Sequence, residues 1–337
     1  MPGLYTDEFV ERLRQGALSL VGEWGLSPET TVELLNISEN ATFRADDPRA
    51  IDPRGRQPLV IRVHRPHYHT REEILSELAW IDALRDAGFV NIARPVPLRD
   101  GGRIARFALG DDVRDVVAFE FMPGREPSAE EDLEDGFRKL GAISARLHRQ
   151  TRSWKRPPGF IRKTWNFDTT VGRTPYWGDW REGLGLEAEG RAVLERAAAV
   201  LERRLAAFGR GKDRFGLIHA DLRLANLLVD GSRIGVIDFD DCGFGWFAFD
   251  FAAAISFIET DPSIPKLQAA WIGGYREVEP LDAASEAEMP TFIMLRRLQL
   301  TAWIASHRET PTAREMGTAF TDGTIAIAES YLTSPPR

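Results

Sequence analysis

The sequence predicts an α+β protein of two lobes, in which a small mixed β-sheet lobe precedes a larger, mainly helical lobe. Strand-like runs surround one amphipathic helix within roughly the first 120 residues, a length that suits one compact core. The linker-like segment Met122–Pro127 follows, and the composition then changes to that of helices. We therefore expect an N-terminal lobe over residues 1–119, a hinge over 120–127 and a C-terminal lobe over 128–337.

The N-terminal lobe is expected to begin with a helix, because Phe9, Leu13 and Val21 lie at helical spacing, and then to hold several strands and a further helix. Strands are predicted at residues 31–35, 41–44, 59–63, 103–107 and 116–121. The segment Asp46–Pro58 is rich in Asp, Pro, Gly and Arg, which predicts an exposed hairpin loop. Thr70 and Glu73 have the spacing of a capping box, and the apolar stripe that follows predicts a helix that Gly88 ends.

The C-terminal lobe is expected to be helical apart from one β segment. Ser128 with Glu131 predicts the start of a helix that runs to about His148, and a second helix is expected over residues 186–208. The irregular stretch 154–180 between them is rich in tryptophan, which favours either packing or the walls of an acceptor pocket.

Composition and charge exclude several classes of protein. Hydrophobic residues make up 43% of the 337 residues, which is enough for full-sized cores. The net charge of −8 argues against a nucleic-acid partner, because proteins that bind phosphate backbones carry a basic excess. Cys242 is the one cysteine, so no internal disulfide forms. Neither a signal peptide nor a membrane span is found, and we expect a cytoplasmic protein of undetermined oligomeric state, with no membrane partner.

The β segment at residues 217–240 concentrates polar side chains. Leu227–Val229 and Ile234–Ile237 are apolar strands, and the Asp-Gly-Ser sequence between them is a hairpin turn signal. If the turn centres near Ser232, the numbers of facing residues sum to about 463. Asn226 then lies within a residue or so of Asp238 at the mouth of the hairpin.

This arrangement suits phosphate chemistry. Mg²⁺ takes one or two protein oxygens together with substrate phosphates, so Asn226 and Asp238 are the candidate metal ligands. Asp221, on the loop that leads into the hairpin, is left to accept a proton from an attacking hydroxyl, worth roughly 10²–10⁴-fold in rate. Arg223 would place a cation against the transferring group. Asp221 and Arg223 are therefore the candidate catalytic residues.

The segment from His219 to Asn226 fits the H-x-D-L-x-x-x-N catalytic loop of kinases, and Asp238 follows on the second strand. Together with Leu35–Phe43, Leu59–Pro66 and Leu140–His148, it makes the chain resemble the aminoglycoside phosphotransferase-like kinases. Within them it is similar to the branch of stress-response kinase A and the type II homoserine kinases. The resemblance implies a bilobal protein-kinase-like fold that uses ATP and Mg²⁺.

The resemblance also implies roles for other residues. Phosphates would be held by the backbone around Ser38, Asn40 and Thr42, and adenine by groups of the connecting segment at Glu120 and Met122. Arg62 stands where kinases usually carry a lysine; it is permanently charged and is expected to pair with Glu77. These seven residues are the candidate nucleotide-binding set.

The catalytic loop itself is expected to need support. The resemblance implies that Asp250 is a buried brace for this loop, and His219 is expected to orient it by hydrogen bonding. Asp240 and Asp241 are open to two interpretations, additional metal or substrate contacts or a solvated turn.

The predicted function is ATP-dependent transfer of the γ-phosphate to a hydroxyl of a small molecule, such as an amino alcohol, a sugar or an aminoglycoside-like compound. Asp238-Phe-Asp240 replaces the Asp-Phe-Gly of conventional protein kinases, and no Ala-Pro-Glu sequence follows. Two alternatives stay open: a Ser/Thr protein kinase of the stress-response kinase A type, and a nucleotide-binding module without catalysis.

Overall fold

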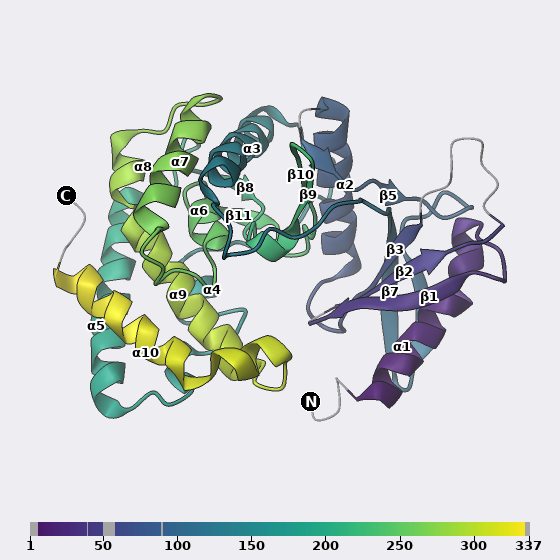
Figure 1. Cartoon of the computed structure of the whole chain (residues 1–337), viewed down its shortest axis with the longest axis horizontal. Helices are drawn as coiled ribbons and strands as arrows, with labels where there is room; N and C mark the ends of the chain where they lie inside the picture. Colours follow the sequence, from purple (N-terminus) through teal and green to yellow (C-terminus); the bar gives the residue numbers. More distant parts are fainter. Residues whose placement is uncertain (1–5, 39, 50–57, 89, 334–337) are drawn as a thin grey trace. The chain divides into compact units, whose positions relative to one another are not determined.

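The computed structural model describes residues 6–38, 40–49, 58–88 and 90–333 and consists of two compact units (Figure 1). Unit 1 comprises Met1–Gly124 and Arg156–Ile161, and unit 2 comprises Arg125–Lys155 and Arg162–Arg337. Residues 156–161 fall in the expected C-terminal lobe but lie in unit 1. They are anchored there because the Ile161 N–H donates to Ser76 Oγ at 3.0 Å.

Unit 1 is built from one antiparallel sheet and two main helices. Its elements are α1 (Asp7–Ser19), a 3₁₀ turn (Val21–Trp24), β1 (Thr31–Ile37), β2 (Ala41–Asp46), β3 (Leu59–Val63), α2 (Arg71–Ala87), β4 (Asn91–Ile92), β5 (Pro95–Val96), β6 (Ala105–Leu109) and β7 (Asp112–Glu120). The five predicted strand regions are confirmed: residues 59–63 match β3, and the other four have shifted ends. The expected loop over 46–58 lies mostly outside the described residues.

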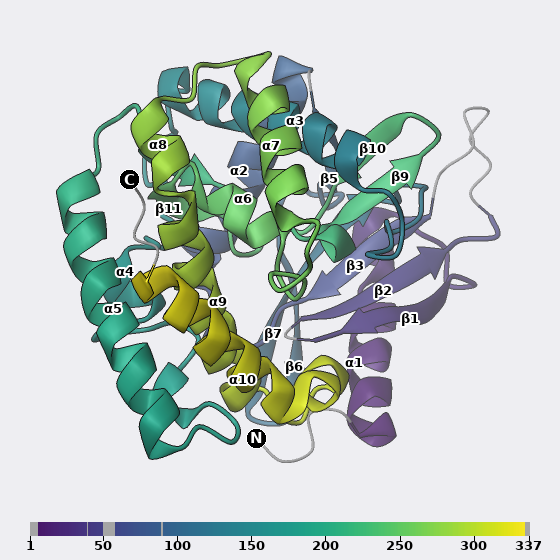
Figure 2. The same ribbon diagram turned by 60° about the vertical axis from the view of Figure 1, so that its left-hand side comes forward.

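The sheet of unit 1 has the order β1-β2-β3-β7-β5, with β6 also paired to β7. All of these pairings are antiparallel, so the mixed sheet expected from the sequence is wrong in this detail. The short connections that join β1 to β2 and β6 to β7 require antiparallel pairing within those two pairs. Helix α1 packs against the sheet, and Leu13 and Ala17 join its apolar core with Phe43 and Val63 (Figure 2).

Helix α2 begins and ends where its sequence predicts. The Thr70 side chain accepts from the Glu73 N–H while the Glu73 side chain accepts from the Thr70 N–H, which is a complete capping box. Gly88 ends the helix in the left-handed conformation, with φ of 75°. Glu77 lies on the buried face of the helix, so α2 carries one acidic side chain into the interior of unit 1.

Unit 2 is mainly helical. Its helices are α3 (Glu134–Ser153), α4 (Phe167–Thr170), α5 (Ala188–Phe208), α6 (Phe249–Ala254), α7 (Ile264–Arg276), α8 (Ala283–Ala287), α9 (Met289–Ser306) and α10 (Pro311–Thr333), with 3₁₀ turns at Trp180–Glu182 and Leu224–Asn226. Its strands are β8 (Phe215–Ile218), β9 (Leu227–Asp230), β10 (Arg233–Val236) and β11 (Gly243–Trp246). The fold class predicted from the sequence, α+β with a sheet lobe and a helical lobe, is confirmed.

Helix α3 does not begin at Ser128 as predicted. It begins at Glu134, because Ser128 instead closes a turn: its hydroxyl accepts from the Glu130 N–H and its carbonyl from the Glu131 N–H. Short polar side chains that bond to nearby backbone compete with helix formation in this way.

Helices α3 and α7 pack closely (Figure 2). A Cβ atom on Gly141 would lie 2.0 Å from the Trp271 carbonyl oxygen, and one on Gly274 would lie 1.8 Å from the Arg138 carbonyl oxygen. The two glycines therefore let the helix backbones touch, which no larger residue permits at either position.

Helix α9 is buried around most of its circumference by α5, α6 and α10, and its neighbouring arginines Arg296 and Arg297 are buried with it. A helix that is surrounded on all sides has an apolar sequence, so each buried charge on it needs a partner. None of the described helices is long and apolar enough to cross a membrane.

Candidate active site

The β9–β10 hairpin has the register expected from its sequence. Asp230 pairs with Arg233 and Leu227 with Val236, so the numbers of facing residues sum to 463. Gly231 begins the two-residue turn with φ of 58°, as primed hairpin turns require. At the mouth, the Ile237 N–H donates to the Asn226 carbonyl at 3.0 Å. This bond brings Asn226 to the residue directly before Asp238.

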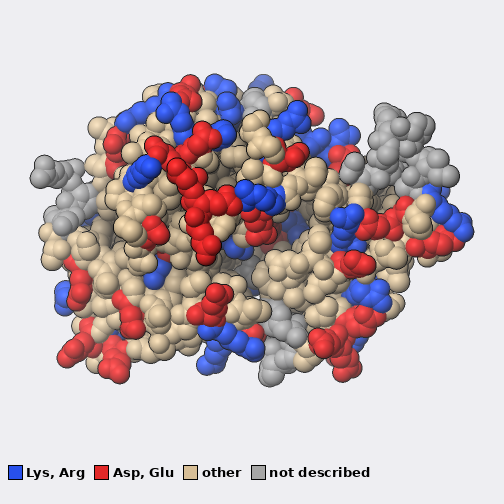
Figure 3. Space-filling view, in the orientation of Figure 1, with Lys and Arg blue, Asp and Glu red and all other residues tan. Residues whose placement is uncertain are grey.

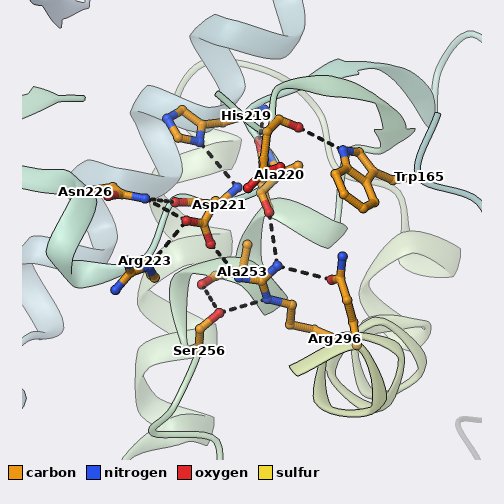
Figure 4. Close-up of polar contacts among 12 residues, drawn as sticks. Trp165, His219, Ala220, Asp221, Arg223, Asn226, Ala253, Ser256 and Arg296 are labelled. Carbon is orange, nitrogen blue, oxygen red and sulfur yellow. Dashed lines mark hydrogen bonds and ion pairs between the residues drawn. The ribbon is translucent and has the colours of Figure 1, made fainter. Parts of the chain in front are cut away.

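The carboxylate of Asp221 is held from two sides (Figure 4). Its Oδ2 accepts from Asn226 Nδ2 at 2.8 Å and from Arg223 Nε at 3.3 Å. Its Oδ1 accepts from Arg296 Nη2 at 2.5 Å. The Asp221 side chain keeps 13% of its surface exposed, whereas that of Arg296 keeps 1%. The carboxylate is thus fixed in orientation but still accessible.

Asp250 braces the backbone that precedes Asp221, as the family resemblance implies. The Ala220 N–H donates to its Oδ1 at 2.8 Å and the His219 N–H donates to its Oδ2 at 3.3 Å. Ala220 has φ of 67°, a left-handed conformation that costs a non-glycine residue of the order of 1–3 kcal/mol. The bonds to fully buried Asp250 help to stabilise this conformation.

Two further buried side chains complete the brace. His148 Nε2 lies 2.9 Å from Asp250 Oδ2, and His148 Nδ1 lies 3.1 Å from the Tyr275 hydroxyl. Burial lowers the pKa of His148, against the opposing effect of the Asp250 hydrogen bond, and burial raises the pKa of Tyr275. A neutral His148 therefore donates from Nε2 to Asp250 and accepts at Nδ1 from the Tyr275 O–H.

His219 ties the catalytic loop to the second strand of the hairpin. Its Nε2 lies 3.1 Å from the Ile237 carbonyl, and its Nδ1 accepts from the Asp221 N–H at 3.3 Å. The ring is fully buried. The prediction that His219 orients the loop is confirmed by these contacts.

The segment after Asp238 is anchored by Arg162, which the sequence interpretation did not single out, and by Trp165 of the tryptophan-rich stretch 154–180. Buried Arg162 donates from Nε to the Cys242 carbonyl at 2.7 Å and from Nη2 to the Asp240 carbonyl. Trp165 Nε1 donates to the Asp241 carbonyl at 2.8 Å. Asp240 and Asp241 are only 4% and 6% exposed, so the interpretation as a solvated turn is wrong.

The residues at the hairpin mouth fit a divalent cation bound together with phosphates. The amide nitrogen of Asn226 donates to the carboxylate and the carbonyl of Asp221, which leaves the amide oxygen for a cation. Asp238 is exposed and has φ of 60°. Among the described residues no group of three His, Cys, Asp or Glu side chains could hold a metal alone. A small protein donor set of this kind is typical of Mg²⁺ that is completed by substrate phosphates.

In unit 1, Arg62 and Glu77 form the ion pair expected from the sequence. Arg62 Nη2 lies 2.8 Å from Glu77 Oε1 and 2.6 Å from Glu77 Oε2. The two side chains are 6% and 0% exposed. Arg62 also lies over the Phe119 ring and pairs in the sheet with Thr42, another predicted nucleotide-binding residue.

The remaining predicted nucleotide-binding residues also lie in unit 1. The Ser38 N–H donates to the Asn40 carbonyl at 3.3 Å, and Asn40 Oδ1 accepts from the Arg65 N–H at 3.0 Å. At the end of β7, exposed Glu120 lies 3.8 Å from Arg94. Met122 Sδ lies 3.9 Å from Asn91 Nδ2. Their roles toward a nucleotide stay predictions.

Comparison with known proteins assigns the chain to a protein family. The sequence profile of the phosphotransferase enzyme family matches residues 35–281. The chain belongs to the phosphotransferase enzyme family. A solved structure of a microcompartment-associated aminopropanol kinase is similar to this phosphotransferase with a TM-score of 0.87 and 44% identity, over 95% of this chain and 98% of that chain.

Amicoumacin kinases are more distant relatives. The one from Bacillus subtilis (strain 168) is 24% identical to this phosphotransferase over 253 residues, 72% of each chain. The solved amicoumacin kinase hAmiN, in complex with AMP-PNP, Ca²⁺ and Ami, has a TM-score of 0.74 at 22% identity, over 96% of this chain and 94% of that chain. The latter likeness concerns the fold.

The predicted reaction class is confirmed. This phosphotransferase is a kinase that transfers phosphate to a hydroxyl of a small molecule. The sequence interpretation missed Arg162 and Arg296. The signal for Arg296 was present, since Leu295-Arg-Arg-Leu298 puts charges into an apolar helix, where an arginine needs a carboxylate or carbonyl partner.

Proposed function

We propose that this phosphotransferase moves the γ-phosphate of ATP to the hydroxyl of a small amino alcohol of the aminopropanol class. The chemistry depends mainly on one observation: the carboxylate of Asp221 is accessible, fixed on both oxygens, and bonded to Asn226 at the hairpin mouth. The class of acceptor is supported by the similarity to the aminopropanol kinase, which extends over nearly the full length of both chains.

Asp221 is the proton acceptor in this proposal. As the acceptor oxygen forms its bond to the γ-phosphorus, the bond from that phosphorus to the β–γ bridging oxygen breaks, and ADP leaves. The hydroxyl proton passes to the Asp221 carboxylate. Because the transition state of phosphoryl transfer is loose, the main task of the protein is to position the groups and to compensate charge. Arg223, next to Asp221, would stabilise the charge on the transferring group.

Asn226 and Asp238 are the proposed ligands of Mg²⁺, which supplies charge compensation on the phosphates when it is bound. Unit 1 is the proposed nucleotide-binding part. Arg62, held by Glu77, would contact phosphate oxygens, together with the backbone from Ser38 to Thr42. The backbone at Glu120 and Met122 would hold adenine. The segment 120–127 is the proposed hinge between an N-terminal lobe over 1–119 and a C-terminal lobe over 128–337.

We place the enzyme in the cytoplasm, where ATP is available, and we propose no nucleic-acid or membrane partner. The net charge of −8 supports the absence of a nucleic-acid partner. On the described part of the face in Figure 3, Lys and Arg are interspersed with Asp and Glu rather than gathered into a broad basic surface.

The test is ADP release from Mg·ATP with a panel of acceptors. The panel holds 1-amino-2-propanol, ethanolamine, homoserine, choline, a sugar, an aminoglycoside and a Ser/Thr protein substrate. Propylamine is the matched control, because it keeps the amine and lacks the hydroxyl. We expect the highest kcat/KM with the short amino alcohols, no stimulation by propylamine and loss of turnover in EDTA.

Faster turnover with the protein substrate would favour the protein-kinase alternative and overturn the proposed acceptor. Binding of Mg·ATP without turnover of any acceptor would favour the non-catalytic module. Mg·ATP binding is followed separately by the rise in melting temperature, because a ligand that binds the folded state stabilises it.

A further inference from the structure

Arg296 is a fully enclosed cation whose hydrogen bonds reach four other residues. Its Nε donates to Ser256 Oγ at 2.9 Å, and its Nη1 donates to Gln299 Oε1 at 3.1 Å and to the Ala220 carbonyl at 3.4 Å. Its Nη2 donates to Asp221 Oδ1 at 2.5 Å (Figure 4). Every nitrogen of this guanidinium therefore donates to the protein itself.

These bonds fix the catalytic loop at two consecutive residues. At Ala220, Asp250 accepts from the backbone N–H and Arg296 donates to the carbonyl. The residue in the left-handed conformation is therefore hydrogen-bonded at both of its backbone polar groups. At Asp221, Asn226 and Arg223 hold Oδ2 while Arg296 holds Oδ1. The carboxylate is planar, so bonds at either oxygen restrict its rotation, and Arg296 supplies the bond at Oδ1 among these contacts.

The surroundings of Arg296 keep it rigid. The Trp177 ring lies 5.0 Å from its guanidinium carbon, and Ser256 is held by a bond from its own hydroxyl to the Ala253 carbonyl. The planar guanidinium can serve several acceptors at fixed angles, which a lysine ammonium cannot do with the same geometry. With its nitrogens engaged and 1% of its side chain exposed, Arg296 is not placed to bind an acceptor molecule.

We propose that Arg296 is the positioning residue of the proton acceptor: it orients the Asp221 carboxylate, through Oδ1 and the Ala220 carbonyl, toward the hydroxyl that is phosphorylated. This inference rests on the proposed function, in which Asp221 accepts the hydroxyl proton. Each carboxylate oxygen has two lone pairs, so Oδ1 keeps one for that hydroxyl after it has accepted from Arg296.

The neighbouring Arg297 is a matched control for Arg296. It lies on the same helix, is 4% exposed at its side chain and forms an ion pair of the same length, 2.5 Å, with Glu259 Oε2. Its other bonds go to Thr324 Oγ1 and the Phe320 carbonyl, away from the catalytic loop. Replacement of either arginine disturbs one buried ion pair on α9, but only Arg296 contacts Asp221.

The experiment compares Arg296→Lys with Arg297→Lys in the full-length chain, with active enzyme corrected for the folded fraction. For Arg296→Lys we expect kcat to fall roughly 10²-fold, the cost of a small misplacement of a catalytic group. The KM for ATP and for the acceptor should change by less than about threefold, since Arg296 contacts neither in this mechanism. Arg297→Lys should lose comparable thermal stability and keep kcat within about twofold.

Ser256→Ala is a milder second variant that keeps both arginines. It removes the bond to Arg296 Nε, and we expect a kcat loss of a few-fold with unchanged KM values. Equal kcat for wild type and Arg296→Lys, or equal losses in Arg296→Lys and Arg297→Lys, would overturn the inference, because either result means that Arg296 only stabilises the fold.

The proposed function can fail independently of this inference. If amino alcohols are not phosphorylated but another acceptor is, the same variants are compared on that acceptor. If no acceptor is phosphorylated, a double-mutant cycle of Arg296→Met and Asp221→Asn is measured by urea unfolding. Non-additive midpoint shifts then support the coupling between the two side chains, and additive shifts overturn it.

Discussion

Two arginine–carboxylate pairs, one in each unit, use the same chemistry for different purposes. In unit 1 the Arg62–Glu77 pair is enclosed, with Glu77 fully buried and both of its oxygens bonded to one guanidinium nitrogen. In unit 2 the Arg296–Asp221 pair has an enclosed arginine, but its carboxylate is 13% exposed. The carboxylate of the second pair can still accept a bond from a reactant, whereas that of the first pair cannot.

The difference shows how a fold makes one ion pair structural and another reactive. The buried Glu77 carboxylate is bonded to the Arg62 guanidinium through both of its oxygens. This ion pair links β3 to α2 and fixes the position of the arginine. A carboxylate held from behind by Arg296 and from the side by Asn226 loses rotational freedom without losing access. Each of the following predictions tests one side of this comparison.

Asp221→Asn should have the largest effect. It removes the proton acceptor, while the asparagine side chain has nearly the same size as the aspartate that it replaces. We expect kcat to fall roughly 10²–10⁴-fold in the ADP-release assay. The rise in melting temperature on Mg·ATP binding should persist. A collapse of that rise would mean that Asp221 binds the metal, and the proposed role would be wrong.

Asp238→Ala should abolish the Mg²⁺-dependent part of ATP binding, because one of the two proposed ligands is lost. The measurement is the melting-temperature shift by ATP with Mg²⁺ and with EDTA. Asp230→Ala is the matched control, since Asp230 is an exposed acid at the far end of the same hairpin and should leave the shift unchanged. Equal behaviour of the two variants would contradict the metal site.

Arg62→Met should raise the KM for ATP roughly tenfold, the value of one charge-assisted hydrogen bond. It should also destabilise the protein by about 3–5 kcal/mol, because Glu77 is left buried without its partner. The double variant Arg62→Met with Glu77→Leu separates the two effects: stability in urea should return while the KM stays high. If both the stability and the KM for ATP returned to the wild-type values, Arg62 would affect ATP binding only by stabilising the fold.

The smallest predicted effect concerns pH and the brace behind Asp221. Burial lowers the pKa of His148 in the folded state, so the unfolded chain takes up a proton at higher pH than the folded protein does. Stability from this residue is therefore complete above about pH 6.5 and falls as the pH drops below it, by at most about 1.4 kcal/mol per pH unit. Unfolding in urea from pH 8 to 5 measures this slope, and His148→Gln should flatten it. An unchanged slope in that variant would refute the assignment.

The sequence by itself determined the parts that depend on near neighbours along the chain. The turn signal at Gly231 set the hairpin register, and the register brought Asn226 beside Asp238, because facing strand residues follow from the turn position. The capping box fixed the start of α2 and hence the face on which Glu77 lies. The Arg62–Glu77 partners are 15 residues apart and belong to successive elements, so the partner of Arg62 was predictable.

Other contacts were decided only by the tertiary structure. The Arg296–Asp221 bond joins residues 75 apart, and the bonds from Arg162 to Asp240 and Cys242 span 78 and 80 residues. Sequence patterns show that a buried arginine needs a partner, but they do not show which of several distant carboxylates or carbonyls it meets. The partners are set when α9 packs within unit 2 and when Arg162 packs against the segment that follows the hairpin, because side-chain packing rather than local backbone preference fixes these positions.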